Sequence, residues 1–369
     1  MKLNANFCLA LLITGVSSPA ISQQSTAPNL FEPVPVNQIS SFHQDLAAVR
    51  QDNVFINFDL LGDRAEFGQT NPVVNLNLFE DVNILATFES AEVVYGGGQI
   101  FNYSIGDHDF FYASFSVLTG AVSGVVRSES GELYTIGNVG NGQFTVSEIN
   151  KSLYEECGVN QSHVISTPSP LGGGSGRADG HTSHLMITFT SDCVTAEGGI
   201  DGANTLANLA VSEMNRGLSQ GDSTFRVNLA HTYEDATYTQ SGDQSTDLSN
   251  YRYTGGGLDD VFALRDAYGA DFCELFIANY GTGVAYVGCT NNPDAMFSVG
   301  KNTRVAATYT LAHEIGHNIR LGLLSASSTG LFVVFNTATT TVGFLDPHDV
   351  ERRTISRALF IKFTYLLDY

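Results

Sequence analysis

The sequence is poor in positive charge and in long hydrophobic runs. It contains 17 Lys and Arg against 38 Asp and Glu, which gives a formal net charge of −21. Nucleic acids are bound by basic surfaces, so this balance argues against a nucleic-acid partner. No apolar run reaches the roughly 20 residues of a membrane-spanning helix, and the run at 358–367 is interrupted by Lys362. We therefore expect a protein that neither binds nucleic acid nor spans a membrane.

The composition is that of a globular protein with an export signal. Hydrophobic residues make up 43% of the 369 residues and charged residues 15%, which is typical of folded chains, and this length suggests two domains. Residues 1–22 predict a signal peptide, because Lys2 precedes an apolar stretch at 7–16 and small residues at 20–22 predict a cleavage site. We expect a secreted protein, extracellular or periplasmic.

The first part of the exported chain has a β-strand pattern. Between residues 23 and 165, β-branched and aromatic runs at 54–60, 73–78, 82–88 and 110–118 are separated by Gly, Asn and Asp, and helical spacing is confined to a stretch around 40–50. Residues 166–182 are rich in Gly, Pro and Ser and contain Arg177, which predicts an exposed linker open to proteolysis. The predicted domain boundary lies in this linker.

From residue 183 the pattern alternates between strands and helices. Apolar runs predict strands at 185–190, 225–232, 272–278 and 284–287. Helical spacing predicts helices at 200–218, at 258–268 before Gly269, and at 305–319. Strands interleaved with helices predict an α/β sheet domain.

The last of these helices carries a metal-site motif. His313 and His317 are four residues apart, so they lie one helical turn apart and can hold one metal ion. Glu314 is adjacent to the first histidine and can take a proton from a metal-bound water. Two incidental histidines would give the same pattern, but the signal sequence, the linker and the preceding α/β pattern favour a Zn²⁺ site. The motif predicts hydrolysis through a zinc-bound water with Glu314 as general base.

The motif and its surroundings resemble a known family. His313-Glu-Ile-Gly-His-Asn318 is similar to the zinc helix of metzincins, particularly bacterial secreted enzymes related to the reprolysins (adamalysins). The segments at 185–190, 208–215, 225–231 and 258–271 follow that domain's strand and helix order. The resemblance implies an α/β (α+β) catalytic domain at 183–318 with a mixed sheet and an active-site helix, preceded by an inhibitory β-rich pro-domain at 23–165. It further implies a zymogen of a zinc endopeptidase, whose protein or peptide substrate pairs with the strand at 284–287.

The resemblance ends after Asn318. The family pattern has glycine at the position of Arg320, a third ligand at the position of Leu323 and a later methionine turn, but no methionine follows Met296. The formal charge also changes, from −22 for residues 1–318 to +1 for residues 319–369. We expect 319–369 to be an atypical tail produced by a frameshift, which leaves weak zinc affinity and little or no activity.

Two further features leave alternatives open. The tail holds one polar cluster that could replace the missing ligand, and a solvated turn is the favoured interpretation; the cluster comprises Asp346, His348, Asp349 and Glu351. The alternative function is that of a non-catalytic secreted protein, a degenerate protease whose β-rich domain binds a partner or inhibits an active relative.

The cysteines also allow two interpretations. Four of them follow the signal peptide, and an even number in an exported protein favours two disulfides, with Cys273 and Cys289 as the first pair expected. In several metzincins a pro-domain cysteine instead occupies the open position of the zinc and keeps the enzyme latent. Cys157, just before the linker, could act in this way because thiolate binds zinc well. A disulfide at Cys157 is the favoured interpretation.

Overall fold

The computed structural model describes residues 27–39, 43, 45–62, 73–154, 157–158, 182–221, 223–287 and 293–319, and the backbone of 322–323, 333–334, 341–346 and 349–354. The predicted signal peptide at 1–22 lies outside these ranges, as does the predicted linker at 166–182 except for Thr182. Within the described ranges, no helix combines the length and the apolar character needed to cross a membrane.

The N-terminal half forms one antiparallel sheet of nine strands in the order β1-β2-β9-β8-β7-β6-β5-β4-β3. Its strands are β1 (Phe31–Pro33), β2 (Ala48–Ile56), β3 (Val73–Phe79), β4 (Val82–Val93), β5 (Gln99–Ser104), β6 (Tyr112–Leu118), β7 (Ala121–Arg127), β8 (Leu133–Gly140) and β9 (Gln143–Ile149). The strands predicted at 73–78, 82–88 and 110–118 are confirmed as β3, β4 and β6. The run at 54–60 ends earlier than predicted, because Phe58–Leu60 form a 3-10 helix. The helical spacing around 40–50 was misleading, since residues 46–47 form a turn and 48–50 begin β2.

The C-terminal half is a mixed sheet with helices, in the order β11-β10-β12-β14-β13. Its strands are β10 (Thr182–Thr190), β11 (Arg226–Asp235), β12 (Phe272–Ile277), β13 (Gly283–Ala285) and β14 (Phe297–Lys301), of which only β13 is antiparallel to its neighbour. The helices are α1 (Ser191–Ala196), α2 (Ile200–Gln220), α3 (Gln244–Arg252), α4 (Val261–Tyr268), α5 (Asn302–Val305) and α6 (Thr310–Asn318). The predicted α/β class is confirmed, and α4 ends as predicted at Gly269, which has a positive φ of 62°.

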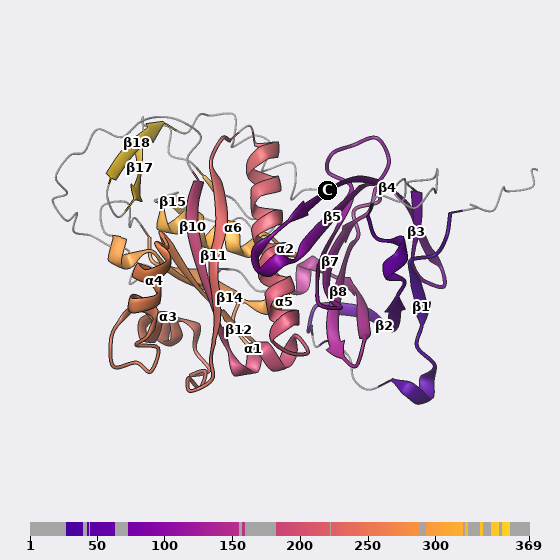
Figure 1. Cartoon of the computed structure of the whole chain (residues 1–369), viewed down its shortest axis with the longest axis horizontal. Coiled ribbons are helices and arrows are strands. Elements are labelled where there is room, and N and C mark those ends of the chain that lie inside the picture. Colours follow the sequence, from indigo (N-terminus) through magenta and orange to yellow (C-terminus); the bar gives the residue numbers. More distant parts are fainter. Residues whose placement is uncertain are drawn as a thin grey trace, which may run out of the picture.

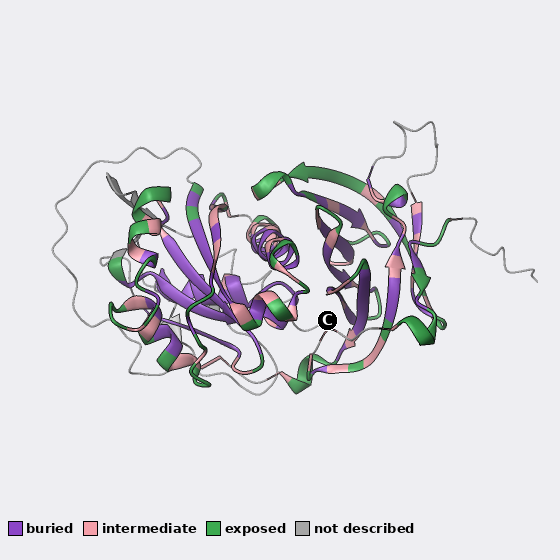
Figure 2. Cartoon of the chain, turned by 60° about the horizontal axis from the view of Figure 1, so that its bottom comes forward, coloured by how far each residue is buried: buried purple, intermediate pink, exposed green. Residues whose placement is uncertain are grey.

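Helix α2 lies between the two sheets (Figure 1). It packs on β6 and β7 of the N-terminal half and on β11 of the C-terminal half, and most of its residues are buried. Figure 2 shows the two halves on either side of this helix, with buried residues on their strands. The core of the C-terminal half continues across this contact, because it includes Val125, Leu133 and Ile149 of the N-terminal sheet. The two halves therefore share buried apolar surface, which favours the docked arrangement.

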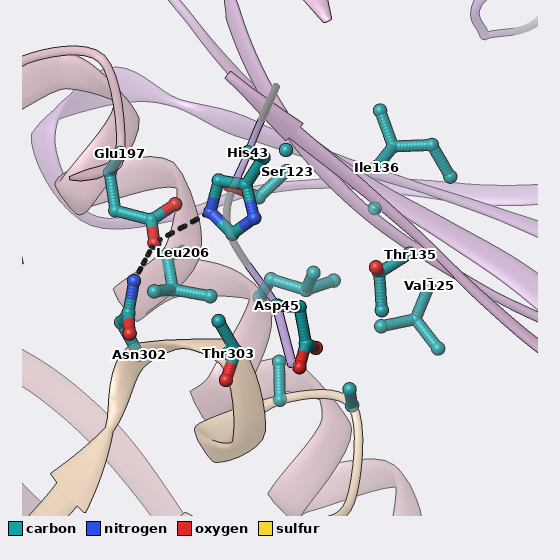
Figure 3. Close-up of a pocket in the computed structure, with 15 residues that line it drawn as sticks. His43, Asp45, Ser123, Val125, Thr135, Ile136, Glu197, Leu206, Asn302 and Thr303 are labelled. Carbon is teal, nitrogen blue, oxygen red and sulfur yellow. Dashed lines mark hydrogen bonds and ion pairs between the residues drawn. The ribbon is translucent and has the colours of Figure 1, made fainter. Parts of the chain in front are cut away.

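A small pocket marks another part of this contact (Figure 3). Glu197, which follows α1 and is 2% exposed, accepts hydrogen bonds from Asn302 at 2.6 Å and pairs with His43 Nε2 at 3.0 Å. Burial lowers the pKa of His43, but the charge and hydrogen bond of Glu197, with the charge of Asp45, outweigh it and the net shift is upward. A histidine from the N-terminal half thus helps to balance a carboxylate buried in the C-terminal half.

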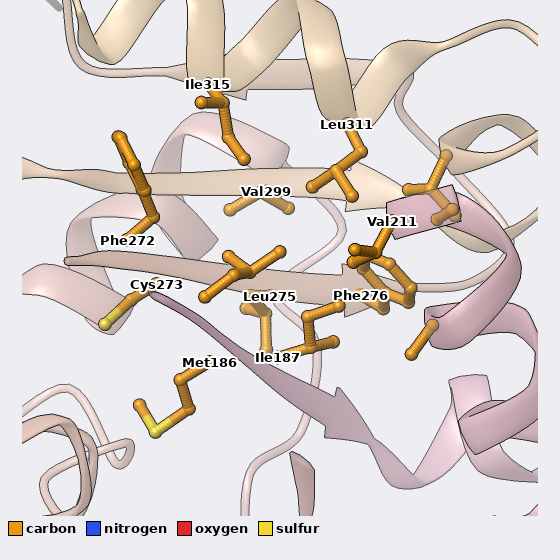
Figure 4. Packing of buried hydrophobic residues seen from close by; sticks show 14 of the residues in the cluster. Met186, Ile187, Val211, Phe272, Cys273, Leu275, Phe276, Val299, Leu311 and Ile315 are labelled. Carbon is orange, nitrogen blue, oxygen red and sulfur yellow. The ribbon is translucent and has the colours of Figure 1, made fainter. Parts of the chain in front are cut away.

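The metal helix predicted at 305–319 is shorter than expected, because α6 covers only Thr310–Asn318 and Val305 is the last residue of α5. Helix α5 ends at Val305, and α6 begins after Tyr309, whose φ of 55° is left-handed. The apolar spacing continues through the break, so sequence periodicity alone could not reveal it. Leu311 and Ile315 of α6 then pack on the sheet next to Leu275 and Val299 (Figure 4). This packing fixes which face of α6 is left for chemistry.

The expected disulfides are not formed by the described cysteines. Cys193 and Cys273 are fully buried free thiols, and Cys289, the predicted partner of Cys273, lies outside the described residues. Burial raises the pKa of the Cys193 thiol well above its usual range. Both therefore behave as small apolar core residues.

Candidate active site

Helix α6 brings His313, Glu314 and His317 to one buried face. The two Nε2 atoms of His313 and His317 lie 2.8 Å apart, with the imidazole rings perpendicular. Glu314 is fully buried, and the two histidines are 9% and 5% exposed. The i, i+4 spacing predicted that the two histidines would meet, and the structure brings them together.

The edge strand β13 closes against α6 because residue 283 is a glycine. A Cβ at Gly283 would lie 2.2 Å from Glu314 Oε1 and 2.6 Å from the Thr310 side chain, so a larger residue would push the strand away. Beyond this contact, Asn318 donates hydrogen bonds to the carbonyl oxygens of Tyr286 at 2.8 Å and Phe297 at 3.2 Å. Sequence reasoning missed Gly283, for which the Gly-Thr-Gly run at 281–283 was the only signal.

Cys157 lies on this same group of side chains. Its thiol is 3.5 Å from Glu314 Oε1 and 3.6 Å from His317 Nε2. The next residue, Gly158, donates its N–H to the Gly283 carbonyl of β13 at 2.8 Å, and a Cβ there would lie 1.8 Å from the Gln244 amide. The chain before the predicted linker therefore contacts both the histidine helix and the edge strand.

Burial dominates the electrostatics of the cluster. It lowers the pKa of His313 to about 3, helped by the charges of His317 and Arg304. It raises the pKa of Glu314 to about 8, although the Cys157 hydrogen bond and the Arg304 charge act in the opposite direction. His313 is therefore a neutral imidazole at physiological pH, which is the form that ligates metals.

The donor set fits a zinc ion. Ligand atoms of Cys157, His313, Glu314 and His317 all lie within 4.8 Å of one another. Imidazole nitrogen and thiolate sulfur are the ligands that zinc prefers, and a buried site with two facing imidazoles needs a cation or a shared proton to satisfy both. Among the described residues no other group of this kind occurs.

A second buried group connects the N-terminal half to the start of α6. The Tyr112 hydroxyl donates to Glu213 Oε2 of α2 at 2.5 Å and shares a hydrogen bond of 2.7 Å with the Tyr309 hydroxyl. Arg127 donates to Tyr112 at 3.0 Å, to Glu213 at 3.3 Å and to the Ala307 carbonyl at 3.0 Å. Because Ala307 and Tyr309 form the break between α5 and α6, strands β6 and β7 help to fix where the histidine helix begins.

The tail contributes no described side chain to this site. Leu323, at the position of the family's third ligand, is in the short strand β15 (Gly322–Leu323), which pairs with β16 (Val333–Val334). Asp346, Asp349 and Glu351 belong to the hairpin of β17 (Thr341–Asp346) and β18 (Asp349–Thr354), while His348 lies outside the described residues. Only the backbone of these strands is described.

A helix with this histidine and glutamate arrangement beside a mixed sheet is the type of site that zinc metallopeptidases use. Comparisons with known proteins agree. Residues 205–322 match the family described as metallo-peptidase family M12B, reprolysin-like. This match confirms the resemblance predicted from the sequence, and it ends close to the residue where the predicted resemblance ends.

The curated relatives are named as metallopeptidases too. A peptidyl-Asp metalloendopeptidase of Stenotrophomonas maltophilia (strain K279a) is 32% identical over 151 residues, covering 40% of this chain and 36% of the relative. A peptidyl-Asp metalloendopeptidase of Xanthomonas campestris pv. campestris is 30% identical over 137 residues, covering 37% and 32%. The chain thus spans about a third of the length of these relatives. Among solved structures, metalloproteinase-II from Bacteroides fragilis aligns with a TM-score of 0.47 at 10% identity, over 83% of this chain and 95% of that one.

Proposed function

We propose that the chain is the secreted zymogen of a zinc metalloendopeptidase, with residues 23–165 as its inhibitory pro-domain. The observation that carries the proposal is the cluster of His313, Glu314 and His317 next to the edge strand β13. Cys157 contacts Glu314 and His317 of this cluster. His313 and His317 would hold the zinc ion. When bound, zinc supplies a Lewis acid that lowers the pKa of a water molecule and polarises the substrate carbonyl.

The remaining steps belong to the protein's own groups. An extended peptide would pair with β13, whose position is fixed by the contact of Gly283 with α6. Glu314 would accept the proton of the attacking water and then deliver it to the leaving amine. Its pKa of about 8 is close to the range in which a carboxylate can both accept and return a proton.

Latency would follow from the same geometry. Cys157 contacts Glu314 and His317, and Gly158 takes the hydrogen bond of β13 that a substrate would use. Proteolysis in the predicted linker at 166–182 would free this segment to leave. Of the two interpretations of Cys157, the geometry thus favours the latency switch over the disulfide.

The relatives' names suggest a substrate preference. They are peptidyl-Asp metalloendopeptidases, so we propose that this chain also favours peptide bonds at an acidic residue. The missing third ligand would weaken zinc binding once Cys157 has left. We therefore expect low turnover from this sequence, as its tail after Asn318 predicts.

A single substitution tests the enzymatic proposal. The full chain is loaded with zinc, nicked in the linker and assayed on casein, with Glu314→Gln as the test variant. Removing a general base should lower turnover by about 10²–10⁴-fold while zinc content is unchanged. Glu234→Gln, at the opposite edge of the sheet in β11, is the matched control. A folded, zinc-free protein without turnover would support the non-catalytic alternative instead.

A further inference from the structure

Arg304 is a cation built into the approach to the candidate active site. It lies in α5, and its carbonyl oxygen accepts a hydrogen bond from the Thr308 N–H at 3.1 Å, in the break before α6. Its charge opposes the burial that raises the pKa of Glu314, and it helps to lower the pKa of His313. Arg304 therefore lies on the short helix directly before α6, and its charge is felt at His313 and Glu314.

In the intact chain this guanidinium is covered by the N-terminal half. It lies 4.7 Å from the centre of the Tyr154 ring, within the range of a cation–π contact. The Tyr154 hydroxyl donates to Asp45 Oδ2 at 2.7 Å, which brings a carboxylate to the same corner. An aromatic ring over a half-buried arginine, with an acidic group beyond it, shields a site that would otherwise attract anions.

The ring over Arg304 is close in sequence to residues that contact the rest of the candidate active site. Tyr154 contacts Arg304, Cys157 contacts Glu314 and His317, and Gly158 bonds to β13. Tyr154 precedes Cys157 by three positions, so Arg304 faces a side chain close in sequence to the one at the histidines. A substrate in place of this segment would present one of its own side chains to Arg304.

The geometry points to a role for Arg304 in substrate choice. We propose that Arg304 forms a subsite for the acidic side chain of a peptide substrate, and that Tyr154 covers this subsite in the intact chain. A planar guanidinium pairs with a carboxylate through two parallel hydrogen bonds, which a neutral amide of the same shape cannot match. The proposal rests on the proposed peptidase function and assigns a residue to its acidic preference.

Binding tests the subsite without requiring turnover. The full chain carrying Glu314→Gln is titrated with two fluorescein-labelled hexapeptides that differ only in Asp against Asn, and Kd is measured by anisotropy. Either peptide must displace Tyr154, Cys157 and Gly158, and the two peptides differ in one side chain, so the ratio of their Kd values reports on the subsite. We expect the Asp peptide to bind about tenfold more tightly. Arg304→Gln should bring the ratio to within about twofold, and Arg304→Lys should give an intermediate ratio.

The control is Arg252→Gln. Arg252 also lies over a tyrosine, 4.4 Å from the Tyr286 ring just after β13, so it is the matched alternative. An unchanged ratio in Arg304→Gln, no preference in the parent, or loss of preference only in Arg252→Gln would each overturn the proposal. If Arg304→Gln does not fold, Tyr154→Ala replaces it and should tighten binding of the Asp peptide alone. If the chain that keeps Glu314 prefers the Asp peptide in binding but hydrolyses no faster than Glu314→Gln, the peptidase function is refuted and the subsite stands.

Discussion

Two of the contacts between the halves of the molecule differ in character. In the sheet contact, Tyr112 and Arg127 are buried against Glu213 and Tyr309, with five hydrogen bonds among them and the Ala307 carbonyl. In what we call the cleft contact, Tyr154, Cys157 and Gly158 lie against the candidate active site; their described partners are Arg304, Glu314, His317 and Gly283.

The two contacts differ in what they are expected to do: the sheet contact holds the two halves together, and the cleft contact covers the candidate active site. The sheet contact removes charged groups from water, so breaking it leaves an uncompensated charge in the interior. The described interactions of the half-buried cleft contact are those of a ring, a thiol and one backbone hydrogen bond, which are weak individually. We therefore expect the sheet contact to contribute more to the free energy of unfolding than the cleft contact does.

The largest loss of stability is expected when Arg127, the cation of the sheet contact, is removed. Arg127→Met would leave the Glu213 carboxylate, 1% exposed, without its charge partner. Breaking a buried pair by removing one member costs about 3–5 kcal/mol of the free energy of unfolding. Urea unfolding followed by circular dichroism measures this loss, since the chain has no tryptophan to report by fluorescence.

A double substitution separates charge from packing in this experiment. Arg127→Met combined with Glu213→Met removes both charges and should recover most of the lost stability. If the double variant is as unstable as the sum of the single variants, the loss comes from packing and the electrostatic account of the sheet contact is wrong.

A smaller, pH-dependent effect is expected at His43, next to the sheet contact. Burial lowers the pKa of His43, but the charge and hydrogen bond of Glu197 outweigh burial, so the pKa is raised above 6.5. Asp45, whose charge acts in the same direction, and Asn302 line the same pocket. Stability from a raised histidine pKa is present below the unfolded value and lost as pH rises through the folded value. His43→Gln should cost about 1–2 kcal/mol at pH 6, and less at pH 9. A cost that does not change with pH would contradict the ion pair.

Much of the α/β half could be predicted from the sequence, because its strands and helices are long and strongly patterned. Helix α2 and strands β10, β11 and β12 follow apolar runs whose period matches their structure. The His313 and His317 pair followed from helix geometry alone. The break at Tyr309 was missed because a left-handed residue stabilised by contacts from β6 and β7 leaves no periodic signal.

The rest depended on contacts between residues far apart in the chain. Cys157 is 157 residues from Glu314, so its place at the site could be inferred only from the resemblance, against the parity of the cysteines. The predicted disulfides failed because Cys193 and Cys273 are core thiols, and an even cysteine count carries no information about burial. Arg304 and Tyr154 gave no motif at all, because a cation–π contact needs only proximity.

Within the cleft contact, the Tyr154 hydroxyl should contribute a modest amount. Tyr154→Phe keeps the ring over Arg304 and removes the hydrogen bond to Asp45. We expect a loss of about 0.5–1.5 kcal/mol in the free energy of unfolding, measured as for Arg127→Met. A loss as large as that of Arg127→Met would remove the proposed distinction between the two contacts.

The smallest change in the stability of the metal-free protein is expected for Cys157→Ser. This substitution also gives the sharpest test of the difference between the sheet contact and the cleft contact. The described contacts of the half-buried thiol with Glu314 and His317 are long, so without zinc we expect the substitution to change stability by less than about 0.5 kcal/mol. With zinc the parent should gain stability through its bound metal, and a tenfold weaker affinity in Cys157→Ser would reduce that gain by about 1.4 kcal/mol. Thermal unfolding with zinc and with a chelator measures both quantities, and Cys193→Ser controls for the loss of a thiol elsewhere. An equal zinc-dependent gain in the parent and in Cys157→Ser would mean that Cys157 covers the cleft without binding the metal, and the cleft contact would then be steric alone.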